Sequence, residues 1–173
     1  MTAEPRPIED SLNIPDSRGI NLFECDAGLA ALLQVYLPSA VYQQWLPTLQ
    51  HLGARAGGEL DVLALSADKN PPVLQPRTRR GENLQSIAKH PDYVTLERVA
   101  FAELGLAAMS HQPGGPPPLI KYALTYLFVQ AEFGLCCPVS MTDSLTRTLC
   151  KFGTPELVAR YLPQLQSQDC LLY

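Results

Sequence analysis

The pattern of apolar and polar positions predicts helices along most of the chain, and the clearest one lies in its last third. Residues 119–135 are apolar nearly all round, with Lys121, Gln130 and Glu132 as the strongly polar exceptions. A helix of this kind belongs in the middle of a helical bundle, where other helices cover most of its sides. We expect residues 119–135 to form the central helix and Pro138 to end it.

Two shorter helices should follow the central one. Ser140 and Asp143 have the spacing of a capping box, which predicts a helix that begins at Ser140 and stops at Gly153. Thr154 can cap the last helix, and Pro155 suits its first position. The residues expected to form the buried stripe of this last helix are Leu157, Val158, Tyr161 and Leu162.

Three amphipathic helices are predicted in the N-terminal half. Asp26 is the expected cap of the first, which Pro38 ends, and Ser39 opens the second, in which Pro47 predicts a kink or restart. The third follows the Gly57-Gly58 break and ends near Lys69. The side chains expected to face the core are Leu29, Leu32, Leu33, Tyr36, Val41, Trp45, Leu49, Leu52, Leu60, Leu63, Ala64 and Ala67.

Residues 70–83 are predicted to form the main loop, followed by a short extended piece at residues 84–88. The loop carries Arg77, Arg79 and Arg80, and arginine clusters can bind phosphate groups. No aromatic side chains are interleaved with these arginines, so a solvated loop is favoured over a nucleic-acid contact.

A long helix is predicted over residues 92–109, with Leu96, Val99, Ala100, Leu104 and Ala107 on its buried face. His90 precedes this helix and has no Ser, Cys or carboxylate partner at a recognisable spacing. We therefore expect it to fix the start of the helix and not to act as a general base. Neither His51 nor His111 has a second ligand at helical spacing, and no metal site is predicted.

These elements predict an all-α fold: an up-and-down bundle of about five or six helices, because strand-like alternation is almost absent. Residues 1–20 hold three prolines and few apolar clusters, which indicates an extended arm. Residues 21–169 form the predicted helical domain, and residues 170–173 lead out of it.

Composition and charge narrow the classes of function. The 173 residues suffice for one domain, and a content of 46% hydrophobic and 17% charged residues is typical of a globular protein. A net charge of −4 argues against binding nucleic acid through the whole surface. Residues 119–141 approach membrane-spanning length, but Lys121, Gln130, Glu132 and Pro138 disfavour a spanning helix, and no membrane association is expected.

The five cysteines are Cys25, Cys136, Cys137, Cys150 and Cys170. Their number is odd, and they form neither a C-x-x-C pair nor a zinc pattern. Adjacent Cys136 and Cys137 could pair only in a strained ring. Reduced thiols are therefore expected, with the cytoplasm as the natural compartment.

Several stretches carry a family resemblance. Residues 152–156 (Phe-Gly-Thr-Pro-Glu), residues 159–163 (Ala-Arg-Tyr-Leu-Pro) and residues 167–169 (Ser-Gln-Asp) resemble the end of the N-terminal helical domain of acyl-CoA dehydrogenases. Four others resemble the alkylation-response, AidB-like branch of that family: residues 21–24, residues 70–72, the pair His90-Pro91, and residues 137–142. The ordered set of stretches is more specific than any single one.

The resemblance implies a flavoenzyme family in which a carboxylate removes the α proton of an acyl-CoA and FAD accepts the β hydride. In that family a β-domain holds the flavin and a C-terminal domain supplies the base. The matching stretches include neither, so we assign no catalytic residue and expect this chain alone to bind no cofactor. Residues 170–173 would lead towards the β-domain. The implied partners are the remaining domains of the same enzyme or further copies of it.

The resemblance implies that the segment after the central helix forms one wall of the acyl pocket. Its residues are Pro138, Val139, Ser140, Met141 and Thr142. Helix capping and core packing are the alternative explanation for these residues.

Three hypotheses remain for the chain as a whole: an inactive N-terminal domain of an AidB-like enzyme, a non-catalytic helical interaction module, or an unrelated helical adaptor. The family's link to alkylated DNA belongs to its C-terminal domain, so nucleic-acid binding is not expected here.

Overall fold

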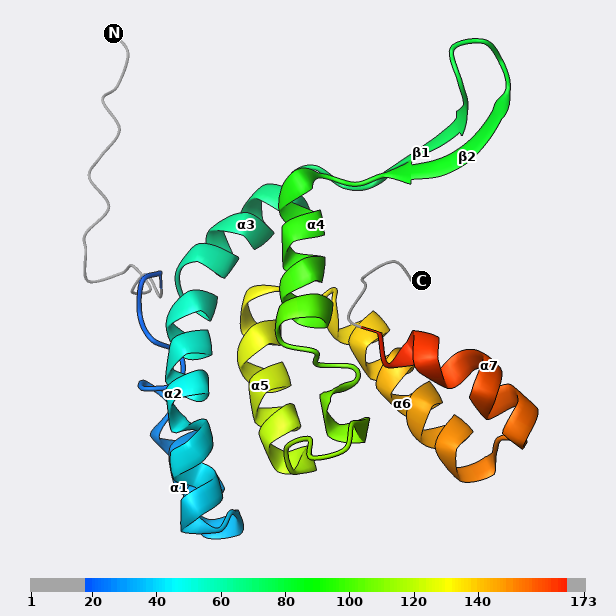
Figure 1. Ribbon diagram of the computed structural model, residues 1–173. Coiled ribbons are helices and arrows are strands. Elements are labelled where there is room, and N and C mark those ends of the chain that lie inside the picture. The colour runs from blue at the N-terminus through cyan, green and yellow to red at the C-terminus, as the bar shows by residue number, and fades with distance from the viewer. Residues whose placement is uncertain (1–17, 168–173) are drawn as a thin grey trace, which may run out of the picture.

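The structure is a computed structural model that describes residues 18–167. This part of the chain forms helices and one antiparallel hairpin (Figure 1). The helices are α1 (Ala27–Tyr36), α2 (Ser39–Ala56), α3 (Glu59–Asp68), α4 (Pro91–Arg98), α5 (Pro118–Ala131), α6 (Cys136–Phe152) and α7 (Pro155–Leu165), and the strands are β1 (Val73–Arg77) and β2 (Asn83–Ala88). The all-α prediction is confirmed, although five or six helices were expected. Most of the predicted arm and the last residues lie outside the described part.

The core is built around α5, as predicted. Helix α5 packs against α2, and α3 packs against α4 (Figure 1). Four side chains of α5 are fully buried: Ile120, Leu124, Leu127 and Phe128. Together with side chains from α1 to α4 and from the start of α6, they form one hydrophobic cluster. Burial of this cluster is the main favourable contribution to folding.

The predicted end of the central helix was wrong. Helix α5 ends at Ala131, and α6 begins at Cys136. Pro138 is the third residue of α6, where a proline is tolerated because the first amide groups of a helix have no intrahelical acceptor. The predicted capping box was also wrong, since Ser140 lies within α6 and the carboxylate of Asp143 is buried.

Three of the predicted helix starts are confirmed. The Asp26 side chain accepts a hydrogen bond from the amide of Leu29 at 2.8 Å, which caps α1. The ring of His90 accepts from the amide of Asp92 at 3.3 Å at the start of α4. Thr154 caps α7, whose first residue is a proline, and Gly153 follows α6 as expected.

The buried faces of the outer helices are smaller than periodicity predicts. In α1 Leu33 is buried, but Leu32 and Tyr36 are exposed. In α7 no side chain is buried, and Leu157 and Tyr161 are exposed. Helix α1 contacts mainly α2 and α7 contacts mainly α6, so most of the apolar stripe of each helix is left uncovered by the described residues.

The predicted helix at residues 92–109 is interrupted. The α-helical part ends at Arg98, and a π-helical turn follows at Val99–Glu103. The amide of Leu104 donates to the carbonyl of Val99 at 2.9 Å, and Gly105 then adopts a φ of +62°, which ends the helix. The buried positions Leu96, Val99 and Ala100 were predicted correctly.

The predicted loop at residues 70–83 contains β1, which pairs with β2 in an antiparallel hairpin. The extended piece at residues 84–88 is confirmed as most of β2.

No helix within residues 18–167 combines the length and the apolar character required to cross a membrane.

The segment before α1 lies on α2, where Gly53 allows a close approach. The amide of Leu22 donates to the carbonyl of Gly53, and the Asn21 side chain donates to the carbonyl of Gln50, both at 3.0 Å. The side-chain oxygen Oδ1 of Asn21 in turn accepts hydrogen bonds from the backbone amides of Phe23 and Glu24. These contacts give residues 21–24, which carry part of the family resemblance, a structural role.

Replacing Gly53 with alanine should lower the free energy of unfolding by about 1–3 kcal/mol. The new Cβ would clash with the Asn21 side chain and lie 2.6 Å from the backbone nitrogen of Phe23. Urea denaturation provides the measurement, with Gly28→Ala in α1 as the control. At Gly28 the Cβ meets only the Asp26 carboxylate at 3.3 Å, so a change below about 1 kcal/mol is expected there. Equal losses at the two sites would contradict the close-packing argument.

Candidate functional site

The predicted acyl-pocket segment forms the first half of α6, and its residues do not share one environment. Val139 is buried in the hydrophobic core, and Pro138 and Thr142 are half-buried. Ser140 is exposed, and the Met141 side chain is 67% exposed. Val139 therefore packs the helix onto the bundle, whereas Met141 faces outwards.

An apolar groove lies between α6 and α7. It is lined by Leu145, Leu149, Tyr161, Gln164 and Leu165 and has a volume of about 470 Å³. Pockets of roughly 300–1,000 Å³ with apolar linings are typical of small-molecule sites. Met141 precedes Leu145 by one turn and therefore lies on the same side of α6.

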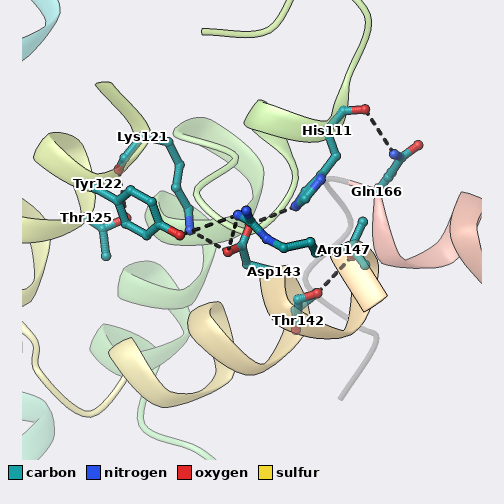
Figure 2. Close-up of polar contacts among 9 residues, drawn as sticks. His111, Lys121, Tyr122, Thr125, Thr142, Asp143, Arg147 and Gln166 are labelled. Atoms are coloured by element: carbon teal, nitrogen blue, oxygen red, sulfur yellow. Dashed lines mark hydrogen bonds and ion pairs between the residues drawn. The ribbon is translucent and has the colours of Figure 1, made fainter. Parts of the chain in front are cut away.

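A buried polar cluster joins α6 to α5 and to the segment before α5, with Asp143 at its centre (Figure 2). One carboxylate oxygen lies 2.9 Å from the Nζ of Lys121, and the other lies 2.8 Å from the Nε2 of His111. Asp143 is 4% exposed and Lys121 is 2% exposed. Buried charges of opposite sign are tolerated when they pair in this way.

The charge state of Asp143 follows from these partners. Burial alone would raise the pKa of this carboxyl, because the charged form loses its hydration. Hydrogen bonds from Lys121 and His111, together with their charges, outweigh burial and hold the pKa of Asp143 below its ordinary value. The carboxylate is therefore ionised at neutral pH.

Two weaker contacts extend the cluster. Arg147 lies 3.5 Å from the Asp143 carboxylate and donates to the hydroxyl of Tyr122 at 3.4 Å. The side chain of Gln166, just after α7, donates to the backbone carbonyl of His111 at 3.3 Å (Figure 2). Both oxygens of Asp143 are engaged by cationic or N–H donors, so the cluster is suited to holding α6 and α7 in place.

Sequence reasoning missed this cluster. It treated Asp143 as part of a capping box, Lys121 as an interruption of an apolar helix, and His111 as a histidine without a second ligand at helical spacing. A signal was present, since a lysine within an otherwise apolar helix requires a buried anionic partner or a route to solvent. The identity of that partner, 22 residues along the chain, depends on the tertiary arrangement.

The comparisons with known proteins agree with the observed bundle. A family model described as the adaptive response protein AidB N-terminal domain matches residues 13–170. This chain belongs to the AidB N-terminal domain family. The third hypothesis, an unrelated helical adaptor, is therefore excluded.

Two relatives of this AidB N-terminal domain are informative. Acyl-CoA dehydrogenase family member 11 of Caenorhabditis elegans is 23% identical over 155 residues, which cover 86% of this chain and 25% of the relative. A solved structure described as Bd2924 apo-form is 30% identical with a TM-score of 0.79, and the match covers 93% of this chain and 33% of that one. The AidB N-terminal domain thus spans about a quarter to a third of these relatives.

Residues 70–72, one of the stretches that resemble the AidB-like branch, lie beside α4, the helix that begins at the His90-Pro91 pair. Pro71 and Pro72 line a small cleft of about 190 Å³ together with Tyr93, which follows the His90-Pro91 pair. Burial raises the pKa of the Tyr93 hydroxyl, and the negative charges of Glu97 and Glu132 raise it further. The Tyr93 hydroxyl is therefore neutral and can donate a hydrogen bond.

The lining of the α6–α7 groove does not supply a site for the diphosphate of FAD. The α6–α7 groove offers Gln164 as the one amide in its lining, and no cation lines it to bind the diphosphate of FAD. Backbone amides at a helix N-terminus can also bind a diphosphate, but no residue of this lining lies at the N-terminus of a helix. Within residues 18–167 no group of three or more metal-ligating side chains occurs.

Proposed function

We propose that this chain is the N-terminal helical part of an AidB-like, FAD-dependent acyl-CoA dehydrogenase and is inactive as a dehydrogenase alone. The observation that carries the proposal is the family match over residues 13–170. The lengths of the two relatives support it, because the matched region is only 25% and 33% of them. The remaining parts of such an enzyme would supply the flavin site and the catalytic base.

Within that enzyme we assign this chain the role of one wall of the acyl pocket. Helix α6 presents the Met141 side chain to the outside, and the apolar groove beside α7 begins one turn later at Leu145. An acyl chain is apolar and flexible, and methionine side chains adapt well to such ligands. In this role Met141 contacts the acyl chain, and Val139 fixes the helix that carries it.

The exposed apolar side chains support a covering partner. On α6 and α7 these are Met141, Leu145, Phe152, Leu157 and Tyr161. Leu145 and Tyr161 share the groove between the two helices, and large exposed apolar surface usually marks an interaction site. The remaining domains of the same enzyme are the proposed partner.

The described cysteines are free thiols, which suits the proposed reducing, cytoplasmic location. They are Cys25, Cys136, Cys137 and Cys150.

The proposal predicts that the purified chain retains no flavin. The chain is incubated with excess FAD, passed through a desalting column, and examined by its visible spectrum, with its mass checked against 19.0 kDa. No flavin absorbance is expected, because no described pocket lining supplies a diphosphate site. A stoichiometric yellow complex would contradict this account of the flavin site and reopen the assignment of enzymatic activity to the chain itself.

The second candidate function is a non-catalytic helical interaction module. The same exposed apolar surface of α6 and α7 favours it, since a surface that binds a domain in one protein can bind a separate partner in another. Isothermal titration with a medium-chain acyl-CoA distinguishes the two. Binding that is weakened by Met141→Asp supports the pocket-wall role, whereas no binding favours the interaction module.

A further inference from the structure

The hydrophobic core of the bundle stops at the first turn of α6. Val139 is the last member of the hydrophobic cluster, and no partly buried apolar side chain from residues 140–167 packs against that cluster. Residues 140–167, here called the α6–α7 unit, comprise the rest of α6 and all of α7. Apolar burial is the main source of folding stability, so the α6–α7 unit gains little stability of this kind from the helical body.

The surroundings of the α6–α7 unit show the same separation. Helices α6 and α7 contact mainly each other, and they stand to one side of the bundle in Figure 1. Apolar side chains of both helices line the groove between them. Within residues 140–167 the buried side chains are Asp143 and Thr146, and both are polar. The α6–α7 unit is therefore a helix pair that packs mainly on itself.

Polar contacts attach the α6–α7 unit to the helical body at one place (Figure 2). The carboxylate of Asp143 lies 2.9 Å from the Nζ of Lys121 and 2.8 Å from the Nε2 of His111. The side-chain amide of Gln166 donates to the backbone carbonyl of His111 at 3.3 Å. These partners lie at the start of α5 and in the segment just before it. The contacts of Asp143 with Lys121 and His111 are here called the latch.

The latch resists opening because its ion pair is buried. Asp143 and Lys121 are both shielded from water, and removing one partner leaves the other as an uncompensated buried charge. If the α6–α7 unit moves away, both charges become hydrated and little apolar surface is exposed on the body. Segments with few apolar contacts open at a lower free energy than the core of the same protein. Local opening of the α6–α7 unit should therefore precede global unfolding.

We propose that the α6–α7 unit unfolds locally as one cooperative unit while the helical body stays folded, and that the latch controls this opening. Met141 and the apolar groove belong to the α6–α7 unit, so they are in place only while the latch is closed. The latch thereby regulates the candidate wall of the acyl pocket. This last consequence rests on the proposed function, whereas the local opening itself does not.

The test is hydrogen exchange of the full chain, read by mass spectrometry of short peptides. Relative to their intrinsic rates, the amides of residues 144–165 should exchange at least about tenfold faster than those of residues 123–131 in α5. They should still exchange more slowly than in the unfolded chain, because the closed latch protects them. Equal rates in the two segments would overturn the proposal, as would a complete lack of protection in residues 144–165.

Variants of the latch and of the body separate local from global opening. Asp143→Asn should speed the exchange of residues 144–165 at least about tenfold, and Lys121→Met should act in the same direction. Glu97→Gln is the matched control, because Glu97 is equally buried, at 4% exposed, and pairs with Lys89 in the body at 2.6 Å. That pair stays intact during the local opening. Glu97→Gln should therefore speed the exchange of α5 but leave residues 144–165 within about threefold.

Two results with these variants would contradict the proposal. If Glu97→Gln speeds residues 144–165 as much as it speeds α5, the whole chain opens at once. If Asp143→Asn leaves residues 144–165 unchanged, the latch does not control the opening. The comparison within the unsubstituted chain needs no variant, so it decides the matter even where a variant fails to fold. None of these readouts requires acyl-CoA or flavin, so their failure is distinguishable from a failure of the proposed function.

Discussion

Replacing Asp143 with alanine is expected to lower the free energy of unfolding by about 3–5 kcal/mol. The substitution removes the carboxylate that pairs with Lys121 at 2.9 Å, and the lysine is 2% exposed. The ammonium group would then be buried without its carboxylate partner, 4.3 Å from the centroid of the Tyr122 ring. Urea denaturation followed by circular dichroism measures the change.

Two further variants identify the cause of this loss. Arg147→Ala should cost less than about 1 kcal/mol, because Arg147 is largely exposed and lies 3.5 Å from the same carboxylate. The double variant Lys121→Met, Asp143→Leu should recover much of the loss, since it removes both buried charges. If Asp143→Ala costs no more than Arg147→Ala, the buried polar cluster does not hold α6 in place.

Asp143→Ala should also change how the stability of the chain depends on acid pH. The pKa of Asp143 in the folded state lies below its ordinary value. As the pH falls towards the ordinary value, the unfolded state therefore binds more protons than the folded state. The stability supplied by Asp143 is complete above about pH 4 and is lost as the pH falls through the folded-state pKa. Asp143→Ala should therefore remove this part of the acid dependence.

Replacing Phe128 with alanine should lower the free energy of unfolding by about 3–5 kcal/mol. The Phe128 side chain is fully buried in α5, between helices that have little freedom to collapse into the resulting cavity. The measurement is urea or thermal denaturation under conditions where unfolding is two-state.

Phe133 provides a control of the same residue type, five positions later in the turn before α6. Its side chain is 76% exposed, so Phe133→Ala should change the free energy of unfolding by less than about 0.5 kcal/mol. Comparable losses in the two variants would mean that α5 is not the centre of the core.

Local signals in the sequence predicted the helices and several of their ends. The caps at Asp26 and Thr154 were recognisable because each depends on residues three positions apart. Pro138 misled the prediction, because a proline is compatible both with the end of one helix and with the first turn of the next. Local sequence alone cannot distinguish these two cases.

The extended piece at residues 84–88 was predicted, but strand β1, its pairing with β2 and the polar cluster were missed for a different reason. A proline and three arginines separate the apolar residues of β1 from those of β2, and this composition is typical of a loop. The pairing of the two strands becomes evident only when residues on both sides of the turn are compared. The pairs of Asp143 with Lys121 and His111 join residues 22 and 32 positions apart. Periodicity also overstated the burial of α1 and α7, because it gives the direction of an apolar face but not whether a neighbour covers it.

The distribution of core residues along the chain has a consequence for the order of folding. The last member of the hydrophobic cluster is Val139, and α7 contributes no buried side chain. Synthesis proceeds from the N-terminus, so every core residue has been made before α7 exists. The helical body, with the first turn of α6 that carries Val139, can therefore condense before α7 packs onto it.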